Sequence, residues 1–197
     1  IASEAGANGL RPQVAADRML RLLPELKEVC QIEYRELMSL DSSNLLPEHW
    51  QRMACSVAEL REDYDGFVIS HGTDTMAYSA SALYYMLENI DRPVVLTGAQ
   101  IPIEDPRTDG KRNLLTAFRA AASGRPGVYL AFDGRIIQGN RVKKLYTENF
   151  SAFLSINTKP AGYMSGSQVS WTAETAARPG AFQLHDTLDT RVFVLKL

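Results

Sequence analysis

The feature that most constrains the fold is a strand, a turn and a helix that follow one another within residues 67–90. The apolar run at residues 67–69 is typical of a short buried strand. Apolar side chains then recur at the spacing of one helical face, at Met76, Ala80, Leu83, Leu87 and Ile90. The turn between the two is Gly72, Thr73, Asp74 and Thr75. In open α/β sheets such a turn lies at the carboxyl ends of the strands, where ligands bind.

This turn has two interpretations. The structural one is that Thr73, Asp74 or Thr75 caps the following helix, because helix starts prefer these residue types. The functional one is that two hydroxyls and a carboxylate, beside the unpaired N–H groups of a helix start, meet a small polar substrate.

Elsewhere the chain alternates between helix and strand patterns. The predicted helices cover residues 14–26, 47–60 and the stretch after Asp109. The predicted strands cover residues 29–34, 93–100 and 127–132, with a hairpin through residues 133–134 into 135–137. This order predicts an α/β fold with a doubly wound, mainly parallel sheet flanked by helices.

The two ends of the chain break this pattern. Residues 1–12 resemble a loop, although α/β domains usually open on a buried strand, and residues 157–190 resemble an extended linker. Residues 191–197 alternate like a strand, which needs a sheet partner. We therefore expect an N-terminal catalytic domain at residues 1–156 that lacks its first strand. Residues 191–197 are expected to begin a C-terminal domain that is missing.

Composition narrows the possible partners. The chain has 21 Lys and Arg against 23 Asp and Glu, a net charge of -2, so we expect no nucleic-acid partner and favour a small-molecule substrate. Cys30 and Cys55 lack the spacing of a metal site or a disulfide framework, so no metal is predicted. The sequence shows no membrane-spanning run and no signal-peptide pattern. We expect a cytoplasmic protein without membrane contact.

Further polar clusters follow other predicted strands. Asp41 and Ser42 would share the carboxyl edge with the 72–75 turn if both strands are parallel, whereas Ser43 is explained by a turn before the next helix. A Gly turn with Ala99 ends the strand at residues 93–100. The basic run at residues 140–144 is, by itself, typical of a solvated face.

Taken together, these motifs resemble the bacterial L-asparaginases, most closely their cytoplasmic type I branch. The run His71-Gly72-Thr73-Asp74-Thr75-Met76 is specific to this family. The other matching segments occur in the family's order, and they are Ile1-Ala2-Ser3, Asp41-Ser42-Ser43, Thr97-Gly98-Ala99-Gln100-Ile101-Pro102 and Gly139-Asn140-Arg141-Val142-Lys143-Lys144.

The resemblance implies a two-domain enzyme that hydrolyses L-asparagine to L-aspartate and ammonia through a covalent acyl-threonine intermediate. It implies no cofactor and no metal, and a homodimer or homotetramer whose site is completed across a subunit pair. The implied catalytic residues are Thr73, Asp74 and Lys144. The implied substrate-binding residues are Asp41, Ser42, Ser43, Gly72 and Ala99.

These residue types suit the implied chemistry. A threonine hydroxyl is a poor nucleophile unless a base takes its proton. Lys144 would be the proton-accepting end of a relay, with Thr73 as the shuttling hydroxyl. Asp74 would hold Lys144 and pair with the substrate's α-ammonium group, and Ser42 would bind its α-carboxylate.

The sequence departs from the family at two places. The family's first motif, Thr-Gly-Gly-Thr, would end directly before Ile1, so we expect the nucleophilic threonine to precede the sequence and the fragment alone to be inactive. Leu10 stands where the family often has a Tyr. Two alternative functions stay open. One is the glutamine-hydrolysing subunit of a tRNA-dependent amidotransferase, and the other is a catalytically silent amino-acid-binding domain.

Overall fold

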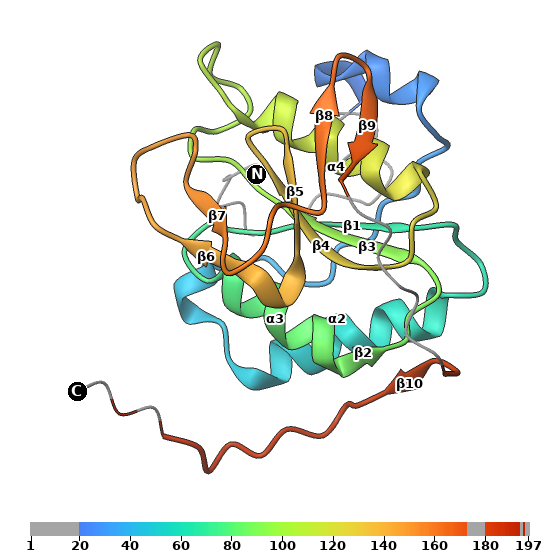
Figure 1. The fold of residues 1–197 in the computed structure, drawn as a ribbon, viewed down its shortest axis with the longest axis vertical. Coiled ribbons are helices and arrows are strands. Elements are labelled where there is room, and N and C mark those ends of the chain that lie inside the picture. Colours follow the sequence, from blue (N-terminus) through green and yellow to red (C-terminus); the bar gives the residue numbers. More distant parts are fainter. Residues whose placement is uncertain (1–19, 173–179, 194, 196–197) are drawn as a thin grey trace.

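The computed structural model describes residues 20–172, 180–193 and 195. Within this part, six strands form the main sheet in the order β1-β3-β4-β5-β8-β9 (Figure 1). Their bounds are β1 Phe67–Ser70, β3 Pro93–Thr97, β4 Gly127–Phe132, β5 Arg135–Gln138, β8 Gly162–Ser165 and β9 Gln168–Trp171. The first three are parallel, and the last three are added antiparallel. The predicted α/β class is confirmed, with a sheet that is mixed.

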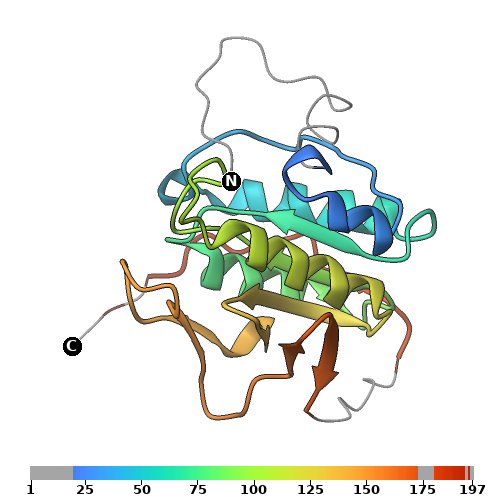
Figure 2. The ribbon, with the colours of Figure 1, turned by 90° about the horizontal axis from the view of Figure 1, so that it is seen from above.

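Helices cover both faces of this sheet because its strands alternate their side chains. Val94 and Leu96 of β3 pack into one core with α2 (Pro47–Leu60) and α3 (Met76–Met86). Val95, between them, packs against α4 (Gly110–Ala122) on the opposite face. Figure 1 shows α4 above the sheet and α2 and α3 below it. In Figure 2 the sheet extends from β1, beside the blue segment that begins at residue 20, to the β8–β9 hairpin at the other edge.

The two helical crossovers of the parallel strands have opposite hands. The connections β1–α3–β3 and β3–α4–β4 advance in the same direction across the sheet, yet α3 and α4 lie on opposite faces. One of the two is therefore left-handed, against the strong general preference for right-handed crossovers. The chain leaves β1 and β3 toward opposite faces, which is the arrangement that opens a ligand crevice at the carboxyl ends of adjacent strands.

The shorter elements complete the description. Three are 3₁₀ turns: η1 (Pro24–Glu28), η2 (Ser42–Asn44) and η3 (Gly139–Arg141). Two small ladders join β2 (Leu87–Glu88) to β10 (Gln183–Leu184) and β6 (Val142–Lys144) to β7 (Phe153–Ser155). No helix in the described part of the chain is long and apolar enough to cross a membrane.

Some predicted elements differ from the structure. The strand predicted at residues 29–34 is wrong, because this stretch makes no strand ladder. The helix expected to continue to Ile90 ends at Met86, and Leu87 enters β2 before a left-handed residue, Asn89 (φ 55°). Residues 157–190, expected to be a linker, contain the β8–β9 hairpin of the main sheet.

Several expectations fall at the chain ends. Residues 20–22 are helical, whereas the predicted helix start at residues 14–19 and the loop at 1–12 lie outside the described residues. The expected strand at residues 191–197 is not seen at its described positions, 191–193 and 195.

Gly139 provides a test of this packing. A Cβ at this position would lie 2.7 Å from Ala80 O in α3 and 3.1 Å from Val128 O in β4, and both of these are backbone atoms that cannot rotate away. We expect Gly139→Ala to lower the free energy of unfolding by about 1–3 kcal/mol, measured by urea denaturation. Gly166→Asn is the control, because Gly166 has a left-handed φ of +59° and open space around it. Equal stability of the two variants would contradict this packing argument.

Candidate active site

The candidate site lies where β1 and β3 end side by side. The His71 N–H donates to Thr97 O at 2.8 Å, so the turn after β1 is joined directly to the end of β3. A Cβ on Gly98 would lie 2.3 Å from His71 O and 2.6 Å from Met76 Cε. Only glycine allows the two turns to approach this closely.

Lys144 joins this edge from a distant part of the chain. Its Nζ donates to Thr73 Oγ1 at 2.9 Å and to Asp74 Oδ1 at 2.8 Å. The Lys144 side chain is 13% exposed, whereas that of Asp74 is 63% exposed. Strand alternation in β6 explains the difference from Lys143, which faces solvent. The three residues predicted as catalytic are therefore in direct contact.

The predicted substrate-binding turn lies beside them. Ser42 is 5% exposed, and its carbonyl accepts from Thr75 Oγ1 at 2.7 Å. A Cβ on Gly72 would lie 2.6 Å from Ser42 Oγ, so these two residues are packed together.

Asp41 and Ser43, by contrast, mainly contact each other. The Asp41 carboxylate accepts from the Ser43 hydroxyl and backbone N–H, and these two bonds lower the pKa of Asp41. Ala99 is half-buried and packs against Gly110 at the start of α4. A Cβ on Gly110 would lie 3.0 Å from the Cβ of Ala99. Neither Asp41 nor Ala99 has a described bond to the Thr73, Asp74 and Lys144 group.

The sequence did not predict the residues that hold the second turn, which follows β3 at residues 98–101. Gln100 Oε1 accepts from Thr73 Oγ1 at 3.2 Å. The Asp109 carboxylate accepts from the Gln100 N–H at 2.9 Å, and Asn113 Nδ2 donates to both Asp109 Oδ2 and Gly98 O at 3.0 Å. An Asp directly before a predicted helix was the available signal, but it is also typical of a cap.

A buried hydrogen-bond chain lies beneath the first turn. His71 Nδ1 is 2.6 Å from Gly72 O, which can only accept, so Nδ1 carries the proton. Nε2 accepts from Ser79 Oγ at 2.8 Å, and Ser79 Oγ accepts from Trp50 Nε1 at 2.9 Å. Burial lowers the pKa of His71, so the imidazole in this hydrogen-bond chain is neutral.

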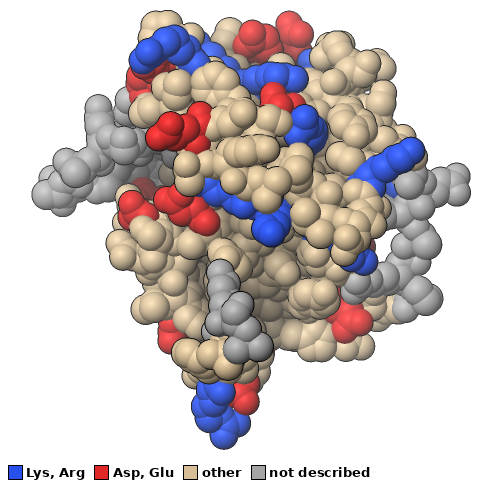
Figure 3. Space-filling model, turned by 60° about the vertical axis from the view of Figure 1, so that its left-hand side comes forward, with Lys and Arg blue, Asp and Glu red and all other residues tan. Residues whose placement is uncertain are grey.

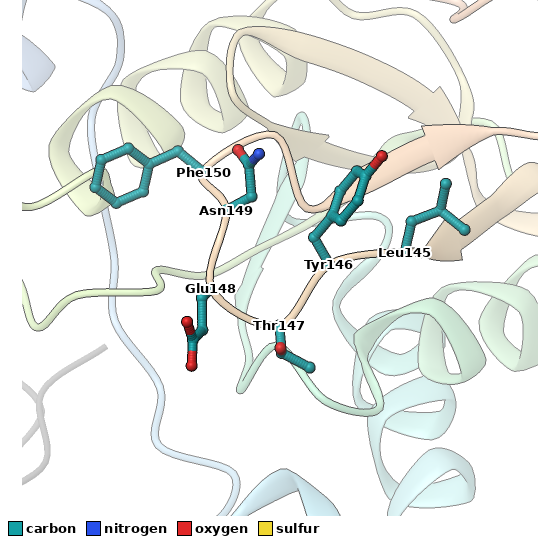
Figure 4. A pocket seen from close by; sticks show the side chains of 6 residues that line it. All are labelled: Leu145, Tyr146, Thr147, Glu148, Asn149 and Phe150. Carbon is teal, nitrogen blue, oxygen red and sulfur yellow. The ribbon is translucent and has the colours of Figure 1, made fainter.

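The surface around the site offers few other candidates. In the described residues, no group of three or more His, Cys, Asp and Glu side chains could hold a metal ion. An open hollow is lined by residues 145–150 alone, the loop that follows Lys144 (Figure 4). On the face drawn in Figure 3, basic and acidic side chains are interspersed.

The fold and the site together define a class: an α/β protein with a hydroxyl, a carboxylate and a lysine amine joined at the carboxyl edge of a parallel sheet. Residues 1–177 match the family described as "Asparaginase, N-terminal". The chain belongs to the asparaginase family.

Known relatives agree with this assignment. The chain is 42% identical to an L-asparaginase of Thermococcus kodakarensis over 170 residues, which cover 86% of the chain and 52% of that protein. It is 49% identical to L-asparaginase 1 of Escherichia coli K12 over 138 residues, which cover 70% of this chain and 40% of that protein. A subunit of the glutamyl-tRNA(Gln) amidotransferase of Archaeoglobus fulgidus is 34% identical over 196 residues, which cover 93% of this chain and 46% of that subunit.

A solved structure gives the same result. The thermostable L-asparaginase from Thermococcus kodakarensis superimposes with a TM-score of 0.84 and 38% identity, covering 96% of this chain and 58% of that one. The chain spans about half the length of the curated relatives that it matches.

The lowered pKa of His71 predicts a pH-dependent stability. The ordinary histidine pKa is 6.5, so below this pH the unfolded chain takes up a proton that folded His71 resists. Stability is therefore lost as the pH falls below about 6.5, and above that pH this group has no effect. We expect the free energy of unfolding of wild type, measured in urea, to fall between pH 7.5 and pH 5 relative to that of His71→Gln. A constant difference would contradict a neutral buried imidazole.

Proposed function

We propose that the full-length protein is an amidohydrolase that converts L-asparagine to L-aspartate and ammonia. The observation that carries this proposal is the contact of Lys144 Nζ with both Thr73 Oγ1 and Asp74 Oδ1. A partly buried amine beside a hydroxyl can accept a proton from it, which an isolated surface lysine would not do. Family membership supports the same chemistry.

The proposed reaction begins with a nucleophilic threonine expected ahead of Ile1. Its oxygen attacks the side-chain amide carbon of asparagine while its proton passes to Thr73 Oγ1, and Thr73 passes its own proton to neutral Lys144. The C–N bond then breaks, and the proton returns to the departing ammonia. Water cleaves the acyl-threonine ester by the same relay and releases aspartate.

Substrate recognition follows from the charges at the edge. Asp74 is largely exposed, so it can hold Lys144 and still pair with the α-ammonium group of the substrate. Ser42, which is packed against Gly72, would meet the α-carboxylate. The turn at Asp41 and Ser43 shapes this end of the site. The reaction needs neither a cofactor nor a metal.

The remaining features of the proposal follow from the family resemblance. The 49% identity with L-asparaginase 1 of Escherichia coli supports the type I branch, and the relatives described above come from both bacteria and archaea. A cytoplasmic location and a homodimer or homotetramer belong to the same proposal.

The relay predicts two inactive variants and one active control. In the full-length protein, Thr73→Val removes the shuttling hydroxyl and Lys144→Met removes its proton acceptor, so each is expected to lower kcat for ammonia release from asparagine by about 10³-fold. Lys143→Met changes the exposed neighbour in β6 and is expected to keep wild-type activity. Near-normal turnover by Thr73→Val or Lys144→Met would exclude that residue from the relay.

A second candidate function is supported by the similarity to the glutamyl-tRNA(Gln) amidotransferase of Archaeoglobus fulgidus. A protein of this kind would hydrolyse glutamine and pass ammonia to a partner subunit. The two functions differ in substrate, because one additional methylene must fit the pocket. A kcat/KM that favours glutamine, together with co-purification of a second subunit, would support the amidotransferase. A preference for asparagine by a protein that purifies alone would support the asparaginase.

A further inference from the structure

Gln100 has a side chain whose orientation is fixed by its neighbours. Its Nε2 donates to two backbone carbonyls of the loop after Lys144, at 3.0 Å to Thr147 O and 3.3 Å to Asn149 O. A carbonyl oxygen cannot donate, so only the amide NH₂ can occupy that end. Oε1 must then face Thr73, whose Oγ1 lies 3.2 Å away.

This orientation gives the Thr73 hydroxyl a second partner besides Lys144. Thr73 Oγ1 lies 2.9 Å from Lys144 Nζ and 3.2 Å from Gln100 Oε1, so the amine and the amide hold the hydroxyl from two directions. A hydroxyl has one proton and two lone pairs, so Oγ1 keeps a lone pair that can receive the proton of the nucleophile.

We propose that Gln100 is a positioning residue that holds the Thr73 hydroxyl within reach of Lys144 Nζ, where the relay needs it, and that it links this hydroxyl to the loop at residues 145–150. The inference rests on the proposed function. At 3.2 Å the bond to Gln100 is long for a hydroxyl donor, so Gln100 holds the hydroxyl while competing only weakly with Lys144 for its proton. Without Gln100, the described bond of this hydroxyl that remains is the one to Lys144, so the Thr73 side chain is held in place from one direction only.

The backbone of Gln100 is held independently of its side chain. Its N–H donates to both carboxylate oxygens of Asp109, at 2.9 and 3.2 Å. A substitution at position 100 therefore leaves the course of the turn in place and removes mainly the side-chain bonds. Methionine has a similar length but neither a donor nor an acceptor of comparable strength.

The test is a double-mutant cycle in the full-length protein with asparagine as substrate. We expect Gln100→Met to lower kcat about tenfold, the effect of losing roughly one hydrogen bond, while KM changes less than about twofold. In a Thr73→Val background the same change is expected to alter kcat by less than twofold, because the hydroxyl through which Gln100 acts is gone. Gln168→Met, at an exposed position of β9, is the matched control and is expected to match wild type.

Three results would overturn the inference: wild-type kcat in Gln100→Met, a change in KM rather than kcat, or the same tenfold loss in the Thr73→Val background. Wild-type kcat in Gln100→Met with a large loss in Thr73→Val would leave the proposed function intact. Full activity of Thr73→Val would contradict both the inference and the proposed function.

If Gln100→Met loses its thermal unfolding transition, the cycle is run with Gln100→Asn, whose amide is one methylene too short to bridge Thr73 and the loop.

Discussion

The parallel pairing of β1 with β3 is the constraint on which the candidate site depends. The pairing is in register to the last residue, with Ser70 opposite Thr97, so both strands end at the same level. The chain then turns toward opposite faces of the sheet, and the two turns are in backbone contact because Gly98 has no side chain. The position of Thr73 and Asp74 relative to Gln100 is therefore set by backbone geometry, before any polar side chain interacts.

Hydrogen bonds from the start of α4 then fix the second turn. Asp109 and Asn113 together satisfy the N–H groups of Gln100 and Ile101 and the carbonyl of Gly98. Asn113 Oδ1 also accepts from the Asp133 N–H at 2.8 Å, which connects the β4–β5 turn to the same anchor. Asn113 is completely buried, so each of these bonds avoids the cost of an unsatisfied polar group in the interior.

The elements that carry their own signal were predictable from sequence. The strands β1, β3 and β4 and the helices α2 and α4 combine a clear period with turn residues at their ends, and their predictions are confirmed. Within the stretch predicted as a strand at residues 29–34, burial alternates from residue 30 onward, since Cys30, Ile32 and Tyr34 are half-buried while Gln31 and Glu33 are exposed. Periodicity reports which way side chains face, whereas a strand also needs a partner that the pattern cannot name.

The same limit applies to the site. Thr73 and Asp74 were visible as a turn after a strand, but the basic run containing Lys144 is typical of a solvated surface, and only the family resemblance selected Lys144. Its contact with Thr73 joins residues 71 positions apart in sequence. Gln100 had no signal of its own, because its role depends on two carbonyls of a loop nearly fifty residues away. Local sequence patterns contain no information on such pairings.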